Sequence, residues 1–335
     1  MTVLVTGASG FVGGWVARAL HGHGERVRAV YRRQTMPDHL AKLSAQGAEV
    51  LRLDLTRPEG VAAAVRGVEA VVHAAARTGD WGSTESFRAV NYELTVRLAE
   101  AAREARCGVF VNIGSVAVHG FGPHVDTTEK GPYYRHVHPY QTTKKLAEEY
   151  VLSLNGPGLR TTSVRPGIVY GPFDTTTLYR ILDAQRLRVW GTLGGGRCLT
   201  CPVYVEDVVQ AVLLALRSER SAGEVFNVTG GERVTWREFL CLASELAGTR
   251  PWLDVPLPVA RAAAWTLGRI VELFRIPTGP RMPPITRYRV DQQSYDFHFS
   301  IAKARGLLGY EPRVGLREGL GRAVAAYRVG AADTP

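Results

Sequence analysis

A tyrosine and a lysine lie four residues apart in a run of good helix formers that begins at Pro139. Pro139 suits the first turn of a helix, so Tyr140 and Lys144 are expected on one helical face. Ser115 follows an apolar run and is expected at the carboxyl end of a strand. If both elements border one crevice, Ser115 can hold a carbonyl oxygen while Tyr140 donates a proton to it as hydride arrives. The Lys144 ammonium would lower the pKa of Tyr140 towards working pH.

A glycine turn at the start of the chain predicts a dinucleotide site. Residues 2–6 form a short apolar run, and Gly7, Gly10 and Gly13 follow before a helical stretch. The first glycine permits a tight turn, the second lets the backbone approach a pyrophosphate, and the third lets helix pack closely on strand. The helix N-terminus then attracts the phosphates.

Strand and helix patterns alternate after this turn. Strands are expected at 26–31, 48–53, 69–73, 108–114 and 159–165, with helices near 37–46, 57–66, 85–106 and 139–155. The alternation predicts an α/β fold with a doubly wound parallel sheet of the Rossmann type and a ligand at the carboxyl ends of its strands. We expect residues 1–171 to form the dinucleotide-binding domain. Residues 172–330 are expected to form a smaller substrate-binding lobe, with some segments returning to the sheet.

The end of the second expected strand bears on the choice of dinucleotide. An NAD site places an acidic residue there for the ribose 2′-hydroxyl, whereas this strand ends in Arg32 and Arg33. Guanidinium groups fit a 2′-phosphate, so we expect NADP(H) to be preferred over NAD(H). The alternative is that the arginines only mark a solvated strand end. Asp54, at the end of the third strand, could accept a hydrogen bond from the adenine amino group or simply serve its turn.

Composition indicates a globular protein of ordinary make-up. Hydrophobic residues make up 45% and charged residues 21% of the 335 residues. The net charge of +10 is spread along the chain without a basic arm, so no nucleic-acid partner is expected. The four cysteines form no disulfide framework, Cys198 and Cys201 lack a second pair for a zinc site, and no metal is expected. With no signal peptide or spanning segment recognised, a cytoplasmic location is expected.

Four motifs together resemble the extended short-chain dehydrogenase/reductase family. They are Thr6-Gly7-x-x-Gly10-x-x-Gly13, Ser115, Tyr140-x-x-x-Lys144 and Arg165-Pro166-Gly167-Ile168-Val169-Tyr170-Gly171. The resemblance implies a catalytic triad of Ser115, Tyr140 and Lys144, with Lys144 also reaching the nicotinamide ribose. Asn91 occupies the position of the asparagine in the family's N-V-x-G-T motif, although Leu94 replaces its glycine.

The cofactor contacts expected from the motifs and the resemblance form one set. The segment after His73 would lie along the cofactor, and Pro166-Gly167 would close over the nicotinamide. The full set is Gly7, Ser9, Gly10, Phe11, Val12, Arg32, Arg33, Asp54, Leu55, Ala74, Ala75, Ala76, Tyr140, Lys144, Pro166, Gly167 and Val169.

Other stretches resemble one branch of this family, the 3β-hydroxysteroid dehydrogenases and 2-alkyl-3-ketoalkanoate reductases. They are Trp81-Gly82-Ser83, Phe87-x-x-x-Asn91 and segments within 286–312. The resemblance implies a hydrophobic 3-keto or 3-hydroxy substrate. Sugar-nucleotide epimerases and dehydratases, the first alternative, usually carry an arginine where this chain has Thr200. A non-catalytic dinucleotide sensor is the second alternative, but such proteins often lose the Tyr–Lys pair.

The segment 259–275 predicts an amphipathic helix. Arg261 and Arg269 project on one face, with Trp265 and Leu267 elsewhere. Such a helix can dock on the core, cover an apolar substrate or lie on a membrane surface, so membrane association is a further hypothesis. Dimers are common among relatives, and a homodimer is another.

Overall fold

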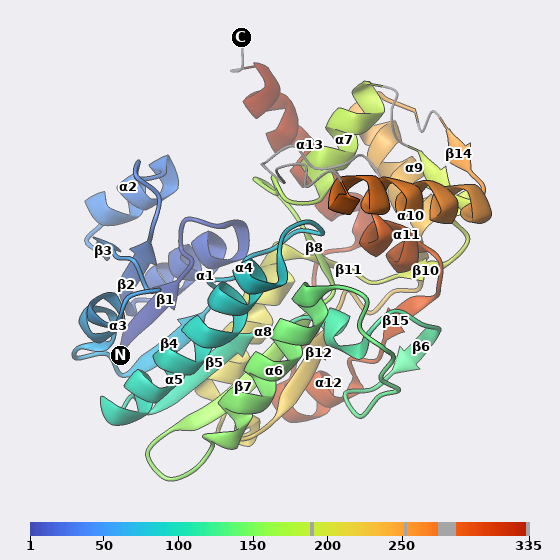
Figure 1. Ribbon diagram of the computed structural model, residues 1–335. Helices are drawn as coiled ribbons and strands as arrows, with labels where there is room; N and C mark the ends of the chain where they lie inside the picture. The colour runs from blue at the N-terminus through green and yellow to red at the C-terminus, as the bar shows by residue number, and fades with distance from the viewer. Residues whose placement is uncertain (188–190, 251–252, 274–285, 333–335) are drawn as a thin grey trace.

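A parallel seven-stranded sheet forms the centre of the computed structural model, which describes residues 1–187, 191–250, 253–273 and 286–332 (Figure 1). The strand order is β12-β7-β5-β4-β1-β2-β3, and every neighbouring pair is parallel. The strands are β1 (Thr2–Thr6), β2 (Arg26–Tyr31), β3 (Glu49–Arg52), β4 (Ala70–His73), β5 (Val109–Ile113), β7 (Arg160–Pro166) and β12 (Val225–Val228). β1 lies inside the sheet, with β2 and β3 on one side of it and β4, β5, β7 and β12 on the other. The strand order therefore reverses at β1, and sheets of this kind bind ligands at the carboxyl ends of the strands beside such a switch point.

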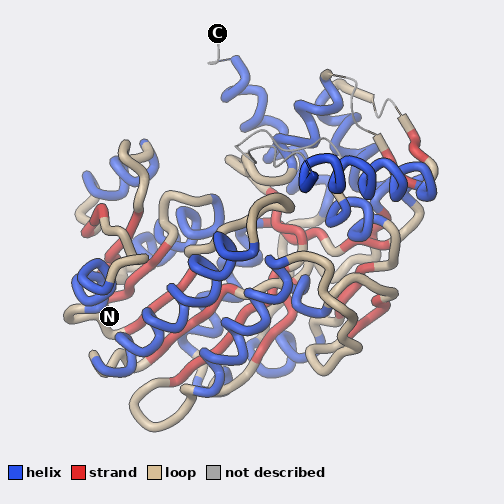
Figure 2. Tube along the Cα trace, viewed as in Figure 1, coloured by secondary structure: helices blue, strands red, loops and turns tan. Residues whose placement is uncertain are grey.

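Helices cover both faces of the sheet (Figures 1 and 2). Side chains alternate along β1, so Val3 and Val5 join one core and Leu4 joins the other. One face carries α1 (Phe11–Gly22), α2 (Asp38–Ala45), α8 (Val205–Arg217) and α12 (Ala302–Leu308). The other carries α3 (Pro58–Val65), α5 (Leu94–Glu104) and α6 (Pro139–Ser153). The α/β fold predicted from the sequence is therefore confirmed.

The late part of the chain contributes to the sheet as well as to a second lobe. β12 pairs with β7, and α8 and α12 pack beneath them. The second lobe contains α7 (Leu178–Arg186), α9 (Trp236–Ala247), α10 (Leu257–Leu273), α11 (Arg287–Gln293) and α13 (Leu316–Ala332). Short paired strands link the parts: β6 (His124–Thr127), β8 (Ile168–Tyr170), β9 (Thr192–Leu193), β10 (Leu199–Thr200), β11 (Pro202–Tyr204), β13 (Val234–Thr235), β14 (Asp254–Val255) and β15 (Phe297–Phe299).

The expected helix at 259–275 is α10, although residues 274 and 275 lie outside the described part of the chain. Its buried side carries Ala260 and Ala264, which pack with Leu193 and Val290. Trp265 is 66% exposed on the opposite side. The helix therefore docks on the second lobe, and membrane contact stays a prediction. Within the described residues no helix is long and apolar enough to cross a membrane.

Candidate active site

A cavity of about 1480 Å³ opens at the carboxyl ends of the central strands and extends between α7, α9 and α11. All seventeen cofactor residues expected from the sequence line it, and so does Ser115. Asn91 is the one expected site residue that does not. The cavity thus joins a dinucleotide-sized half on the sheet edge to a second half in the smaller lobe.

The glycine turn between β1 and α1 has the shape that a pyrophosphate needs. Gly7 has φ of +66°, and a Cβ there would lie 2.7 Å from the backbone of Ala75. A Cβ on Gly13 would lie 2.3 Å from the Gly7 carbonyl oxygen. No side chain caps the first turn of α1, which begins after Gly10 at the cavity wall. Its unpaired N–H groups are suited to phosphate oxygens, so the residues present fit a bound dinucleotide.

His73 holds the β4 end of this site in place. Its ring makes hydrogen bonds of 2.8 Å with Thr6 Oγ1 and 2.9 Å with Thr95 Oγ1. Thr6 Oγ1 in turn accepts from the Ala75 N–H. Burial, with a smaller contribution from the Lys144 charge, lowers the pKa of His73 to about 3, so the ring is neutral. The cofactor-facing segment after β4 therefore depends on a buried, uncharged histidine.

Arg32 and Arg33 are exposed at the mouth of the cavity, at the carboxyl end of β2. Asp54 stands across from them after β3, where its carboxylate accepts from the Thr56 hydroxyl at 2.7 Å and the Thr56 N–H at 3.0 Å. These bonds, with smaller contributions from Arg32 and Arg57, lower the pKa of Asp54. The Asp54 carboxylate thus stabilises the turn that follows β3, and the residue also lines the cavity.

Ser115, Tyr140 and Lys144 meet on the cavity wall. Ser115 precedes the 3₁₀ turn η2 (Val116–His119), its hydroxyl accepts from the Ala117 N–H, and it lies near enough to Tyr140 to favour the tyrosinate. Lys144 Nζ donates to the Ile113 carbonyl oxygen at 2.5 Å. Two strictly local features, a strand end and an i, i+4 helical pair, are therefore brought together as the sequence predicts.

The charge state of Tyr140 differs from the expectation. Burial raises its pKa above the ordinary value, opposed by the Ser115 hydrogen bond. The expected net lowering of the Tyr140 pKa was therefore wrong for the protein without cofactor, because the burial of the Tyr140 hydroxyl is the largest effect on it. Burial lowers the pKa of Lys144 to about 8, and Glu148 acts in the opposite direction.

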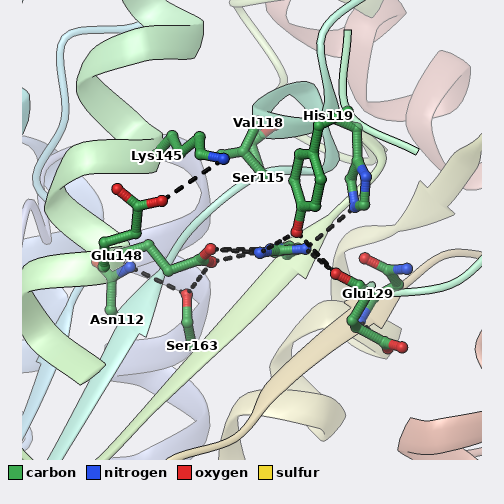
Figure 3. Close-up of polar contacts among 12 residues, drawn as sticks. Asn112, Ser115, Val118, His119, Glu129, Lys145, Glu148 and Ser163 are labelled. Carbon is green, nitrogen blue, oxygen red and sulfur yellow. Dashed lines mark hydrogen bonds and ion pairs between the residues drawn. The ribbon is translucent and has the colours of Figure 1, made fainter. Parts of the chain in front are cut away.

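A buried ion-pair network that includes Glu148, Ser163 and His119 (Figure 3) lies one helical turn from Lys144. Arg165 donates to Glu148 through Nε at 3.0 Å and Nη2 at 2.5 Å, and both side chains are almost fully buried. Ser163 donates to Glu148 at 2.7 Å, and Arg165 also donates to His119 Nε2 at 3.0 Å. Glu148 follows Lys144 by one helical turn, so it presents a fixed negative charge to the lysine.

Asn91 lies in a single π-helical turn, η1 (Ala89–Glu93), between α4 (Thr84–Arg88) and α5. Its side chain accepts from the Arg77 N–H at 2.7 Å and donates to the Arg77 carbonyl at 3.1 Å and to Thr143 Oγ1 at 3.3 Å. The turn occurs where Leu94 replaces the glycine of the family motif. Asn91 thus ties the loop after β4 to α6, and its catalytic role stays a prediction.

Asp80 and α11 form a contact that sequence reasoning missed. Asp80 Oδ2 lies 2.7 Å from Arg289 Nε and accepts from Thr286 Oγ1 at 2.5 Å. Burial lowers the pKa of His138 to about 4, and nearby Asp80 acts in the opposite direction. Because His138 caps the helix that carries Tyr140, the loop after β4 positions both walls of the site. No local signal could reveal it, because Asp80 and Thr286 are 206 residues apart.

The second half of the cavity has a mixed lining, in which apolar and aromatic side chains stand beside polar ones that include Arg180 and Arg289. Tyr288 packs its ring 6.4 Å from that of Tyr140 and 4.8 Å from that of Phe121. The wall beyond is formed by Ile168, Ile181, Ala184, Trp236, Leu240 and Phe297. Among these wall segments, the start of α9 could be recognised from the sequence, because Thr235 and Glu238 have the spacing of a capping box.

Two features weighed from the sequence lie away from the cavity lining. Thr200, at the position of the arginine in sugar-nucleotide enzymes, is buried within β10. Cys198 and Cys201 are free thiols, and burial raises the pKa of Cys201 to about 12. Among the described residues no group of His, Cys, Asp or Glu side chains could hold a metal ion.

Comparison with known proteins agrees with this geometry. Residues 3–229 match the model of the NAD dependent epimerase/dehydratase family. A 4-hydroxy-2-methyl-3-oxo-4-farnesyl-3,4-dihydroquinoline-1-oxide ketoreductase of Stigmatella aurantiaca is 34% identical over 96% of this chain and 95% of its own. A 2-alkyl-3-oxoalkanoate reductase of Stenotrophomonas maltophilia (strain K279a) is 30% identical over 97% and 99%. The structure of MoeE5 in complex with UDP-glucuronic acid and NAD is 26% identical, with a TM-score of 0.77 over 98% of this chain and 100% of that one.

These matches run through both halves of the cavity rather than through the dinucleotide half alone. They confirm the resemblance to ketoreductases and a nicotinamide dinucleotide as cofactor. The chain belongs to the NAD-dependent epimerase/dehydratase family, as an NAD(P)-dependent dehydrogenase/reductase of the extended short-chain type.

Proposed function

We propose that the protein interconverts a secondary alcohol and a ketone on a hydrophobic substrate, of a steroid-like or long-alkyl 3-hydroxy or 3-keto kind. The observation that carries this proposal is that Ser115, Tyr140 and Lys144 line one wall of the cavity, where its half on the sheet edge meets its half in the smaller lobe. Two hydroxyls at such a junction can bind one carbonyl oxygen and pass a proton to it.

Each of the three side chains has a separate task in this proposal. Ser115 positions the substrate oxygen, and Tyr140, which is protonated at neutral pH because its pKa is raised, donates the proton in the reducing direction. Lys144, held by the Ile113 carbonyl, places a positive charge beside the nicotinamide ribose site and favours the tyrosinate that proton donation leaves. The bound nicotinamide supplies or accepts the hydride.

We further propose that NADP(H) is preferred, with Arg32 and Arg33 holding the 2′-phosphate. Both are exposed at the cavity mouth, and charge-assisted hydrogen bonds to a phosphate are among the strong ones. Of the remaining cofactor residues, those of the glycine turn hold the pyrophosphate, Asp54 faces the adenine, and Pro166 and Gly167 cover the nicotinamide. A cytoplasmic location, a homodimer and the absence of a nucleic-acid partner stay predictions.

A sugar-nucleotide epimerase or dehydratase is the second candidate, because MoeE5 is similar over the whole chain. A sugar nucleotide brings a diphosphate, which needs cations, and Thr200 has neither charge nor access to the cavity, although Arg180 and Arg289 line its second half. The aromatic and aliphatic part of that lining supports the ketone or alcohol instead. The silent sensor is disfavoured because Ser115, Tyr140 and Lys144 are assembled.

The test is a side-by-side panel of 3-keto steroids, 2-alkyl-3-oxo acids and UDP- or TDP-hexoses with both nicotinamide cofactors. We expect NADPH oxidation with the apolar ketones and neither binding nor conversion of the sugar nucleotides. Tyr140→Phe should lower turnover by about 10²–10⁴-fold while leaving NADPH affinity nearly unchanged. Tight binding of a sugar nucleotide without response to any apolar ketone would move the protein to the second candidate.

A further inference from the structure

Phe173 is an exposed aromatic residue on the wall of the cavity. It is 61% exposed, and it belongs to the cavity lining. Single exposed apolar side chains are common on protein surfaces, so exposure alone says little. Among the described residues, however, the other large hydrophobic side chains with comparable exposure, such as Leu187 and Trp265, lie outside the cavity lining. Phe173 is therefore apolar surface that a ligand in the cavity can cover.

The backbone of Phe173 is strained. Its φ is +70°, in the left-handed region where a bulky residue is an outlier and glycine is the usual occupant. Two other non-glycine residues of the described chain have a positive φ, Arg106 after the end of α5 and Asp126, a residue type that tolerates this region. Strained residues of this kind gather at ligand-binding positions, where the surrounding structure holds them. The conformation of Phe173 thus points to a ligand.

The loop at 171–177 imposes this conformation. The Phe173 N–H donates to the Tyr179 hydroxyl at 2.8 Å. The Asp174 carboxylate is buried and accepts from three N–H groups at the start of α7, at 2.8 to 3.0 Å. On the other side, Trp15 of α1 donates through Nε1 to the Pro172 carbonyl at 3.2 Å. The loop is anchored to α1 and to α7, so the phenyl ring is held at the cavity rather than packed into a core.

The position of this loop indicates which ligand the ring meets. The loop leads from β8 to α7 of the second lobe (Figure 1), and a Cβ on Gly171 would lie 3.5 Å from Phe11 Cζ. In the proposed cofactor arrangement the adenine lies at Asp54 and the nicotinamide near Tyr140, so the turn beside Phe11 faces the phosphates. A phenyl ring offers no hydrogen bond to a phosphate, whereas it suits the apolar part of a substrate in the second lobe.

We propose that Phe173 holds the apolar part of the substrate that extends away from the reacting carbon. When an alkyl chain or a ring system covers the phenyl ring, apolar surface of both leaves water, which favours binding. The ring thus contributes to binding rather than to folding. This inference rests on the proposed function and narrows its substrate to apolar ketones or alcohols that extend from Tyr140 to the loop after β8.

The experiment compares methyl 3-oxobutanoate with methyl 3-oxododecanoate, using NADPH and the whole protein. We expect the long ketone to have the higher kcat/KM, and Phe173→Ala to lower its value about tenfold, as suits the loss of a partly covered phenyl ring. The short ketone and NADPH affinity should stay within about twofold, because neither depends on the ring. Phe173→Tyr keeps an aromatic ring and should keep most of the preference. Leu187→Ala is the matched control, since Leu187 is 73% exposed outside the cavity lining, and it should change neither ketone.

Thermal unfolding without substrate supplies a second readout. Phe173→Gly removes the ring together with the backbone strain, because glycine adopts a positive φ readily. This variant should unfold at or above the temperature of the unmutated protein, although it reduces the long ketone as poorly as Phe173→Ala. A clearly lower unfolding temperature would show that the ring stabilises the fold itself, and would overturn the inference.

Calorimetry with the same ketones and the NADP⁺-loaded protein, which cannot reduce them, keeps the two proposals apart. Reduction without a gain from chain length, or with a gain that Phe173→Ala retains, overturns the inference and leaves the proposed function standing. An equal loss of NADPH affinity in Phe173→Ala does the same, because the ring would then be a cofactor contact. If the long ketone binds more tightly, loses that advantage in Phe173→Ala and yet is not reduced by NADPH, the inference stands and the proposed function fails. If neither ketone binds or reacts, both fail.

Discussion

Replacing Glu148 by glutamine tests two effects of the buried network: it stabilises the folded protein, and it keeps Lys144 protonated. The substitution keeps the size of the side chain but removes the negative charge that faces Arg165 and lies one turn from Lys144. Arg165 is 4% exposed and directs its bonds of 3.0 and 2.5 Å at this carboxylate. The variant therefore leaves a buried cation without its partner.

The structure sets the expected magnitudes. Breaking a buried ion pair by removing one partner costs about 3–5 kcal/mol of unfolding free energy. Lys144 has a pKa of about 8, which Glu148 holds up against burial. At pH 7.5 about three quarters of Lys144 is then protonated, and removing the charge of Glu148 should lower the pKa of Lys144 and with it this fraction.

Two measurements check this reasoning. Urea unfolding of the NADPH-bound protein reports the stability loss, and the pH profile of kcat/KM for ketone reduction should show its basic limb moved to lower pH. The matched control is Glu149→Gln, because Glu149 is its exposed neighbour, 3.5 Å from Lys145 Nζ, and exposed pairs contribute about 1 kcal/mol or less. A Glu148→Gln protein as stable as this control, with an unmoved basic limb, would refute the assignment.

Three further predictions concern cofactor choice, acid stability and the contact between the lobes. Arg32→Ala should weaken NADPH binding by about 1.5–3 kcal/mol and spare NADH, as measured by calorimetry; equal affinities in the unmutated protein would contradict the proposal. Burial lowers the pKa of His73, His119 and His138 to about 3, 3 and 4 in the folded protein. Below pH 6.5 these histidines are therefore protonated in the unfolded chain but still neutral in the folded protein. Unfolding free energy should fall as pH drops, by up to about 1.4 kcal/mol per histidine and pH unit, and a flat profile in urea titrations would argue against neutral histidines. Asp80→Asn, which loses the ion pair with α11, should lower kcat/KM for ketones about tenfold at unchanged NADPH affinity; equal losses in both would point to general misfolding instead.

Local patterns in the sequence are sufficient to predict the fold of the first half of the molecule. Apolar runs of strand length alternate with helical periods, which predicts the parallel sheet, and the glycine turn after β1 needs no distant partner for its geometry. The same holds for Tyr140 and Lys144, since four residues along a helix place two side chains on one face. The placement of β12 beside β7 was predicted only in outline, because its pairing depends on strand order rather than on strand propensity.

The sequence by itself therefore determined the fold class and the glycine turn, and it singled out Ser115, Tyr140 and Lys144 as candidates, since each of these follows from patterns within one or two elements. Only the tertiary structure decided that Asp80 holds α11 and that Tyr140 has a raised pKa. These properties depend on burial and on contacts between segments up to 206 residues apart. Burial is summed over every element that packs around a group, so no local pattern of residues encodes it.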